Sequence, residues 1–570
     1  MQAPGRVLTK GPGIDLRRRG ASRRSHAQPR KSGYLVSATN RANSNEEPDP
    51  AKVPTDLPDG PPEPGEDGTD FGEVKQLGLV AAIASLSYVF WICGGMEMIE
   101  RLAFYGVRAV SGIYVTDPAS KGGLAATPSQ YGTILVFWAL FQNVVAVLTG
   151  GLSDRYGYKE TIFVSTVVKI SGYLTMAFFP TYAGFFVGAI LLATGTAIFK
   201  PGIQGTLVRS TTKQNSSMAW GIFYQTVNIG GFLGPLLAGY MRKMAWSNVF
   251  FACAAIICLN FLMLLTYKEP GKEERLKRAR LEKANPGARK DLIAESLLEL
   301  RKPHVWTYLV VFSGFWLLFY ALFDVLPLHI QDWVDTRGIV STLFGTHGTT
   351  NPVVKFFIVM NKDGTEIQPE GMLNLNAGLI MLTCFLFALL SGKMRATTSM
   401  VIGTLLATVA IILSGSSTLG WISVGAIAIF SVGEMLSSPK FSEFIGNFAP
   451  ADKKAMYIGF AQAPVATGMA IEGKLGPWLY DHFASKERFS RELLESKGLL
   501  TGKALTDIPQ GEAFAKLIEL THGDKWELTY QLYATHHVGT VWYIMAAIGV
   551  LTAFGIYSYG SWVSRMKKAK

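Results

Sequence analysis

The chain has 570 residues, a formal net charge of +12, 49% apolar residues and 12% aromatic residues. This composition is typical of a polytopic membrane protein and excludes a soluble enzyme with one anchor. The charge does not indicate nucleic-acid binding, because most basic residues lie in an N-terminal arm and in loops expected on one side of a membrane. The four cysteines fall in or beside apolar segments, so we predict no disulfide framework, metal site or cofactor.

The N-terminal arm has the composition of a targeting segment. Residues 1–45 carry ten Lys or Arg and a single acid, Asp15, without the apolar core of a secretory signal. Such acid-poor, Arg- and Ser-rich arms resemble organelle transit peptides, and Val36-Ser37-Ala38 is similar to a plastid processing site. Residues 46–70 are acidic and Pro-rich, which is typical of a disordered linker. We interpret 1–75 as a disordered arm with an organelle transit peptide, for a plastid ahead of a mitochondrion. An ordinary cytosolic tail is the alternative, and it leaves another membrane such as the plasma membrane open.

Twelve apolar segments follow the arm, and each is long enough to cross a ~30 Å hydrocarbon core as a helix. They predict an all-α membrane protein with a six-helix bundle over 76–267, a basic linker over 268–303 and a second six-helix bundle over 304–570. The segments are approximately 76–115, 129–150, 160–179, 182–205, 217–240, 246–267, 304–331, 373–391, 398–417, 419–447, 455–480 and 539–562.

The loops predict the orientation of the chain. Basic residues concentrate in the even-numbered loops, the linker and the C-terminal tail, so both termini are expected on the cytosol-like side, which is the stroma for a plastid inner envelope. Two insertions, 332–371 and 481–538, lie on the other side. The first contains Asn361-Lys-Asp-Gly364, a hairpin turn signal. The second is helix-prone and is interpreted as solvated decoration, with a small luminal cap as the alternative.

The first apolar segment carries a row of ionisable side chains. Glu97, Arg101, Tyr105 and Arg108 recur at i, i+4, i+8 and i+11, which is one face of a helix, and Glu100 lies at its edge. A charge at the bilayer centre costs about 2.5–3.5 kcal/mol on insertion scales, so this face must contact protein or water. We predict that it lines a polar cavity; an ion-pair cluster that locks helices together is the alternative.

This segment also shows a family resemblance. Glu97-x-x-Glu100-Arg101-Leu102-x-Phe104-Tyr105-Gly106 resembles the E-x-x-E-R-F-x-Y-Y-G signature of the proton-coupled oligopeptide transporters of the major facilitator superfamily. Leu102 and Phe104 depart from it, where the family has Phe and Tyr. The loop Gly150-Gly-Leu-Ser-Asp154-Arg155-Tyr-Gly157 resembles the superfamily's conformational loop between the second and third helices, whose glycines allow a tight turn.

Three later segments extend the resemblance. Phe199-Lys200-Pro201 looks like the family's F-K-P motif; Pro201 is expected to break the helix, and Lys200 either enters the cavity or snorkels to the interface. Phe223-Tyr224-Gln-Thr-Val-Asn228 resembles F-Y-x-x-I-N, with Asn as interhelical glue as the alternative. Gly433-Glu434-Met-Leu-Ser-Ser-Pro439 resembles P-E-x-x-x-S-P, with Gly433 in place of Pro.

The resemblance implies a symporter that carries di- or tripeptides with protons across a lipid bilayer. It implies that Arg101 and Lys200 hold the peptide carboxylate and Glu434 the ammonium, and that Asp324 in the seventh segment is a gating partner. The substrate site would comprise Arg101, Tyr105, Arg108, Lys200, Tyr224, Asn228 and Glu434. The proton-coupling residues would be Glu97, Glu100, Lys200 and Glu434.

Other functions remain open at this level. A carrier of nitrate or of a metabolite is the first alternative, because Phe104 and Gly433 alter the cavity. A sensor that keeps the fold without transport is disfavoured by the retained acids, since sensing needs no proton coupling. A membrane enzyme would need a nucleophile and base, and we find no such constellation in the sequence.

Overall fold

The computed structural model describes residues 79–568, except 213–214, 274–275, 278–279, 281–297, 299–300, 449–459 and 461. All of these belong to one compact unit, Thr69–Lys570. The predicted arm, residues 1–75, lies outside the described residues, and so does most of the linker. The described chain is built from helices, with two isolated β-bridges in loops.

The first half forms a bundle of six helical rods, preceded by the short helix α1 (Leu79–Ala84). Local caps fix where the rods begin: Thr127 and Gln130 form a reciprocal capping box ahead of Pro128, and Thr181 caps the fourth rod. The rods are α2 (Tyr88–Thr116), α3 (Pro128–Tyr156), α4 (Tyr158–Phe178), α5 (Tyr182–Arg209), α6 (Ser216–Met241) and the pair α7 (Trp246–Ile257) and α8 (Leu259–Leu265).

The second half repeats the arrangement, with two insertions of short helices. Its rods are the pair α11 (Pro303–Asp324) and α12 (Leu326–Trp333), then α15 (Pro369–Gly392), α16 (Ala396–Ser414), α17 (Gly420–Phe448), α19 (Gln462–Phe483) and α24 (Thr540–Lys568). The insertions contain α13 (Arg337–Phe344) and α14 (Pro352–Phe357), and then α20 (Lys486–Ser496), α21 (Lys503–Thr506), α22 (Ala513–Thr521) and α23 (Lys525–Thr535). We call α20 to α23 the cap.

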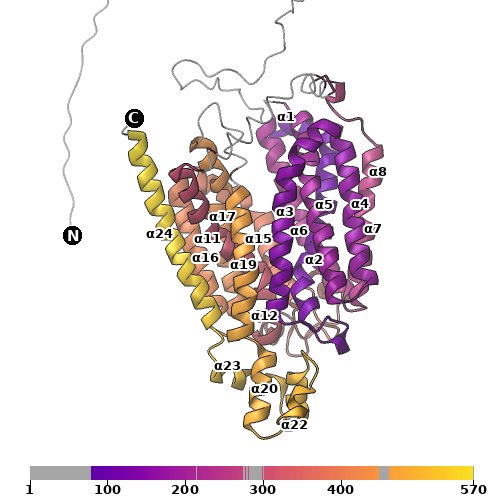
Figure 1. Ribbon diagram of the computed structural model, residues 1–570, viewed down its shortest axis with the longest axis vertical. Coiled ribbons are helices and arrows are strands. Elements are labelled where there is room, and N and C mark those ends of the chain that lie inside the picture. The colour runs from indigo at the N-terminus through magenta and orange to yellow at the C-terminus, as the bar shows by residue number, and fades with distance from the viewer. Residues whose placement is uncertain are drawn as a thin grey trace, which may run out of the picture. The chain divides into compact units, whose positions relative to one another are not determined.

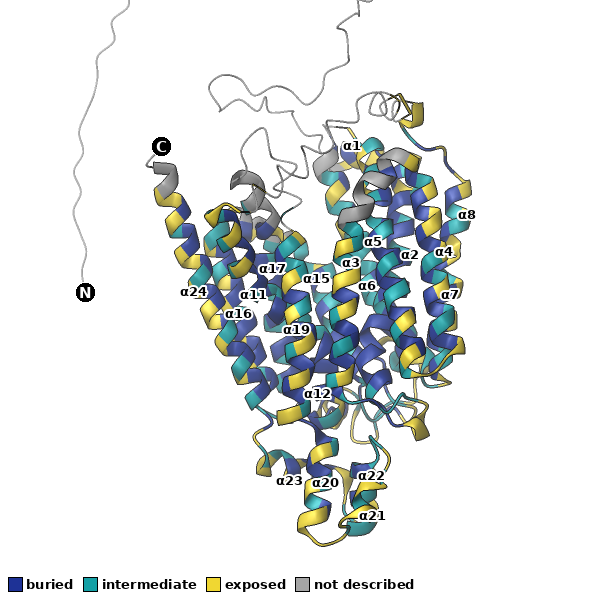
Figure 2. Cartoon of the chain, viewed as in Figure 1, coloured by how far each residue is buried: buried dark blue, intermediate teal, exposed yellow. Residues whose placement is uncertain are grey.

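Within the described part, seven helices or helix pairs are long and apolar enough to cross a membrane by length and composition. The helix α2 is not among them, because it carries four charged residues, Glu97, Glu100, Arg101 and Arg108. Figure 2 shows buried residues facing the inside of each half and exposed residues on the outer faces of helices such as α24. Leu551 and Phe554 on α24 are 70% and 68% exposed, as lipid-facing side chains would be.

The two halves approach each other at one end. We call it the odd-loop end, because it holds the loops around 117–127, 242–245 and 332–368 as well as the cap. In Figure 1 the rods converge there, near α12, and diverge toward the opposite end. Small residues allow the closest contacts between the halves: a Cβ on Gly132 of α3 would lie 2.7 Å from the carbonyl oxygen of Gly473 on α19.

The structure confirms the predicted helical fold and corrects three details. The first segment is not one helix, because it breaks at Ser85–Ser87, where Ser87 caps α2. Pro201 does not break α5, which continues to Arg209 because Gly202 packs closely against Ile162 of α4. The turn at 361–364 forms as predicted, with Gly364 at φ +73° between the bridged residues Met360 and Ile367. The third correction concerns the cap, which packs against the bundle and is not solvated decoration.

Candidate functional site

The acids of α2 form a buried cluster with cations. Arg101 lies between Glu97 and Glu100, with its Nε 3.1 Å from Glu97 Oε1 and a second ion pair to Glu100. The guanidinium also lies 5.2 Å from the ring centroid of Phe104. All three charged side chains are at least 92% buried. The cluster is therefore a desolvated ion network inside the first half.

Lys169 completes this network, and the sequence analysis did not identify it. Its Nζ, on α4, lies 3.3 Å from Glu100 Oε1, and Thr196 donates to the same oxygen at 3.3 Å. The ammonium lies 3.9 Å from the ring centroid of Phe199 and has no solvent exposure. The signal was present, because a lysine inside an apolar segment is itself a functional indication. Its partner could not be read from the sequence.

Lys200 lies in the first half, near the same ion network. It is half-buried on α5, close enough to Glu97, Glu100 and Arg101 to interact with them electrostatically. Glu434 lies in the other half, where it accepts a hydrogen bond of 3.0 Å from Asn376 Nδ2. The structure thus places Lys200 with the acids of the first half and gives Glu434 an amide partner, rather than joining the two predicted partners directly.

A small cavity lies between these groups. Tyr105, Asn228 and Glu434 line it together with Asn374 and Asn376, so both halves contribute polar side chains. Its volume is about 60 Å³, well below the roughly 300–1,000 Å³ of typical ligand pockets. Three of the residues named from the sequence therefore line one cavity, in a conformation with little room for a ligand.

Tyr224 and Asn228 share one face of α6, as their spacing predicts. The Asn228 Nδ2 donates a 2.9 Å hydrogen bond to the carbonyl oxygen of Tyr224, and the Tyr224 side chain is 43% exposed. The two side chains therefore lie together on the same face of α6.

Arg108 and Asp324 form an ion pair between the two halves. Arg108 Nη2 lies 2.7 Å from Asp324 Oδ2 and 2.5 Å from Oδ1, and Nη1 donates to the Tyr131 hydroxyl at 3.2 Å. Asp324 ends α11, and Pro327, which cannot donate a backbone hydrogen bond, follows in α12. The helix break thus presents the carboxylate to α2. The Arg108 guanidinium is paired with Asp324 in this conformation. This pairing favours a role in closing the odd-loop end over the predicted contact with substrate.

A second ion pair closes the same end. Arg242, just after α6, pairs with the fully buried Glu370 at the start of α15 and donates to Gln368 at 2.7 Å. Gln331 also bridges the halves, donating to Asp117 at 2.8 Å. Polar contacts therefore hold the odd-loop end closed in this conformation.

The conformational loop lies at the opposite end. Gly157 separates α3 from α4 with φ +126°, a region that favours glycine. Lys159 Nζ donates to the Tyr267 carbonyl oxygen at 2.7 Å, which ties this turn to the chain after α8. Gly150 lies within α3; the side chains of Asp154 and Arg155 lie outside the described residues.

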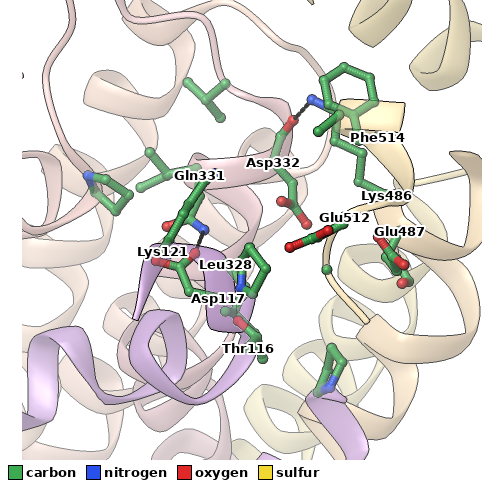
Figure 3. A pocket seen from close by; sticks show the side chains of 18 of the residues that line it. Thr116, Asp117, Lys121, Leu328, Gln331, Asp332, Lys486, Glu487, Glu512 and Phe514 are labelled. Carbon is green, nitrogen blue, oxygen red and sulfur yellow. Dashed lines mark hydrogen bonds between the residues drawn. The ribbon is translucent and has the colours of Figure 1, made fainter. Parts of the chain in front are cut away.

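A larger cavity of about 740 Å³ lies between the cap and the bundle at the odd-loop end. Figure 3 shows Lys486 of α20 reaching Asp332, whose carbonyl oxygen accepts its hydrogen bond at 2.8 Å. Lys486 also donates to Thr529 at 2.7 Å and lies 3.8 Å from the ring centroid of Phe514. Burial lowers the pKa of Lys486 to about 7. The cap thus covers this cavity on the outer side of the closed odd-loop end.

No metal site accompanies these features: within the described ranges, no group of three or more His, Cys, Asp or Glu side chains is arranged to hold an ion.

Two six-helix halves, joined by ion pairs at one end around a small polar cavity, are the architecture of a membrane transporter. The family model for the Major Facilitator Superfamily matches residues 101–473. The chain belongs to this superfamily.

Relatives and solved structures agree with that assignment. The chain is 24% identical to a di-/tripeptide transporter of Lactococcus lactis over 47% of its own length and 52% of that protein. It is 27% identical to the peptide transporter YePEPT of Yersinia enterocolitica over 26% of its own length and 30% of that protein. It is also 21% identical to the multidrug resistance protein MdtH of Edwardsiella ictaluri, over 68% and 85% respectively. The matches to the peptide transporters thus span about a third to a half of those proteins.

The fold resembles that of solved peptide transporters. A mutant POT peptide transporter in complex with alafosfalin matches with a TM-score of 0.57 and 16% identity, covering 81% of this chain and 100% of the other. Tetrameric PepTSo2 matches with a TM-score of 0.57 and 15% identity, covering 84% and 99%. The predicted resemblance to the oligopeptide transporters is therefore confirmed at the level of fold.

Proposed function

We propose that this transporter is a proton-coupled symporter of small peptides. The observation that carries the proposal is the ion network of Glu97, Glu100, Arg101 and Lys169, which is buried beside a cavity lined from both halves. Ionisable groups are costly inside a membrane, and they mark substrate or proton pathways. A carboxylate held between cations changes its proton affinity when those cations move, so such a network can couple protonation to conformational change.

The arrangement of charge across the cavity suits a zwitterion. Glu434 lines the cavity from the second half, whereas Lys200 and Arg101 belong to the first half and are not among its lining residues. A peptide's ammonium and carboxylate would therefore find opposite charges in opposite halves once the cavity opens. The similarity to proteins named as di- and tripeptide transporters supports this substrate class.

Uptake by proteoliposomes under an imposed pH gradient, screened with a peptide library, tests the proposal. Accumulation of a peptide that collapses with the gradient is expected. Lys200→Ala and Glu434→Ala should each abolish it, because each removes a charge that the bound peptide needs. Wild-type rates in either folded variant would contradict the substrate assignment.

The Gln variants of the α2 acids separate coupling from binding. Glu97→Gln and Glu100→Gln keep the shape of each side chain but fix its neutral form, so they should lose pH-driven accumulation and retain exchange between loaded compartments. Arg101→Ala should impair both activities, because it removes a binding cation along with the partner of the acids. Accumulation by both Gln variants would show that these acids are structural.

A second candidate substrate class is an apolar or cationic small solute. Phe319 and Phe323 line the cavity, and the multidrug resistance relative is matched over most of its length. Competition for peptide uptake by lipophilic cations distinguishes the two candidates, since a peptide carrier should be inhibited by dipeptides alone.

The location of the protein is a separate proposal, the plastid inner envelope, supported by the composition of residues 1–75. A fusion of this arm to a fluorescent protein should enter plastids of a photosynthetic host; a diffuse cytosolic signal would remove the targeting claim.

A further inference from the structure

A second carboxyl group lies beside the gate. Glu472, on α19, has no solvent exposure and approaches the carboxyl group of Asp324 closely enough for a hydrogen bond. Two ionised carboxylates cannot make such a bond, because each is only an acceptor. Accordingly, with both groups ionised, neither Glu472 oxygen has a hydrogen-bond partner among the described residues. The contact becomes favourable when one carboxyl carries a proton.

Charge balance leads to the same conclusion. The groups facing Glu472 are Asp324 from α11, Arg108 from α2 and Tyr131 from α3. On α24, which also packs against α19, Tyr559 instead contacts Tyr308. One guanidinium therefore faces two carboxyl groups in a desolvated site. Leaving an uncompensated charge there is strongly unfavourable, whereas one added proton makes the cluster neutral.

We propose that Glu472 is protonated in this conformation and donates a hydrogen bond to the ionised Asp324, so that closure of the odd-loop end requires one proton bound by this pair. The proton comes from water as hydronium, and no other bond is made or broken. Glu472 acts as a positioning residue, because its hydrogen bond orients the ionised Asp324 carboxylate toward the Arg108 guanidinium. Loss of the proton places two carboxylates against one cation and favours opening. The inference rests on the proposed function only in treating this proton as part of the transport cycle.

Infrared spectroscopy of the purified full chain in nanodiscs tests the protonation directly. At neutral pH the wild-type chain should show a protonated-carboxyl stretch that Glu472→Gln removes. Glu370→Gln is the matched control, because Glu370 is also fully buried but is paired with its own arginine, Arg242. The band should persist in that variant. A wild-type spectrum without a Glu472-dependent band overturns the inference.

The distance between two spin labels reports closure of the odd-loop end. The labels are attached at Ser120→Cys and Ser341→Cys, exposed positions in the two halves, in a chain whose four native cysteines have been replaced. The closed fraction of the otherwise unchanged chain should fall as pH rises, whereas Glu472→Gln should stay closed throughout. Asp324→Asn should also stay closed, because Glu472 then ionises and pairs with Arg108.

The double variant Asp324→Asn/Glu472→Gln leaves Arg108 without a carboxylate, and its open-to-closed ratio should rise at least tenfold. A wild-type pH profile in Glu472→Gln, or Asp324→Asn as open as the double variant, contradicts the inference. Neither measurement uses substrate, so these failures leave the proposed function standing. Conversely, a failure of peptide uptake leaves the protonation result standing.

Discussion

The ion pair between Arg242 and Glu370 allows a quantitative test of how the odd-loop end is held closed. Arg242→Met keeps most of the side-chain stem over Trp246 and removes the charge. Glu370, which has no exposure, then loses its cation, and Gln368 loses its donor. The contact joins the two halves only while this end is closed. Its loss should therefore raise the free energy of the closed state and leave that of the open state unchanged.

The size of the effect follows from burial. Removing one partner of a buried ion pair costs about 3–5 kcal/mol. The Arg242 side chain retains 12% exposure, so we take the lower value of about 3 kcal/mol. At about 1.4 kcal/mol per factor of ten, the open-to-closed ratio should rise roughly 150-fold. Distances between spin labels at Ser120 and Ser341 report this ratio.

Two further variants make the test specific. Arg488→Met on α20 removes the same type of side chain from an exposed ion pair with Glu492, whose side chains are 52% and 45% exposed; such pairs contribute about 0–1 kcal/mol, so little change is expected. Replacing both partners, as Arg242→Met/Glu370→Met, should largely restore closure, because no buried charge is left unpaired. A ratio for Arg242→Met within twofold of wild type would refute the reasoning.

Three other outcomes follow from the same structure. Lys169→Met should lower the thermal stability of the purified chain, because Glu100 loses a buried partner; adding Glu100→Gln should restore stability without restoring pH-driven uptake. Because burial lowers the pKa of Lys486 from 10.5 to about 7, the undocked cap binds the proton more readily, and docking should strengthen as pH rises between these values. Protection factors of the cap amides, which correct hydrogen exchange for its base-catalysed intrinsic rate, should rise over that range, and Lys486→Met should abolish the dependence. Gly230→Ala should destabilise the chain by about 1–3 kcal/mol through overpacking, since its Cβ would lie 2.8 Å from Arg101 Cβ, whereas Gly221→Ala, whose Cβ meets nothing within 4 Å, should not.

Much of the fold and part of the site are encoded locally. Uninterrupted apolar segments predict helices, because a backbone in lipid must satisfy its own hydrogen bonds. Helical periodicity places Glu97, Arg101 and Tyr105 on one face. Of the three, Tyr105 lines the cavity, whereas Glu97 and Arg101 form an ion-pair cluster, which was the alternative interpretation. The turn at 361–364 is likewise local, since Gly364 supplies the positive φ that the turn requires.

Tertiary structure decided which charges meet. The sequence analysis identified neither Lys169 nor Glu472, although both are ionisable residues within apolar segments. Their partners, Glu100 and Asp324, lie 69 and 148 residues away in the sequence. Arg242 and Glu370 are separated by 128 residues and belong to different halves. Sequence periodicity assigns a side chain to a face of its own helix, but the face that a neighbouring helix presents depends on how the rods pack and cross. The composition of the ion networks, and with it the gate, is therefore a property of the packed bundle.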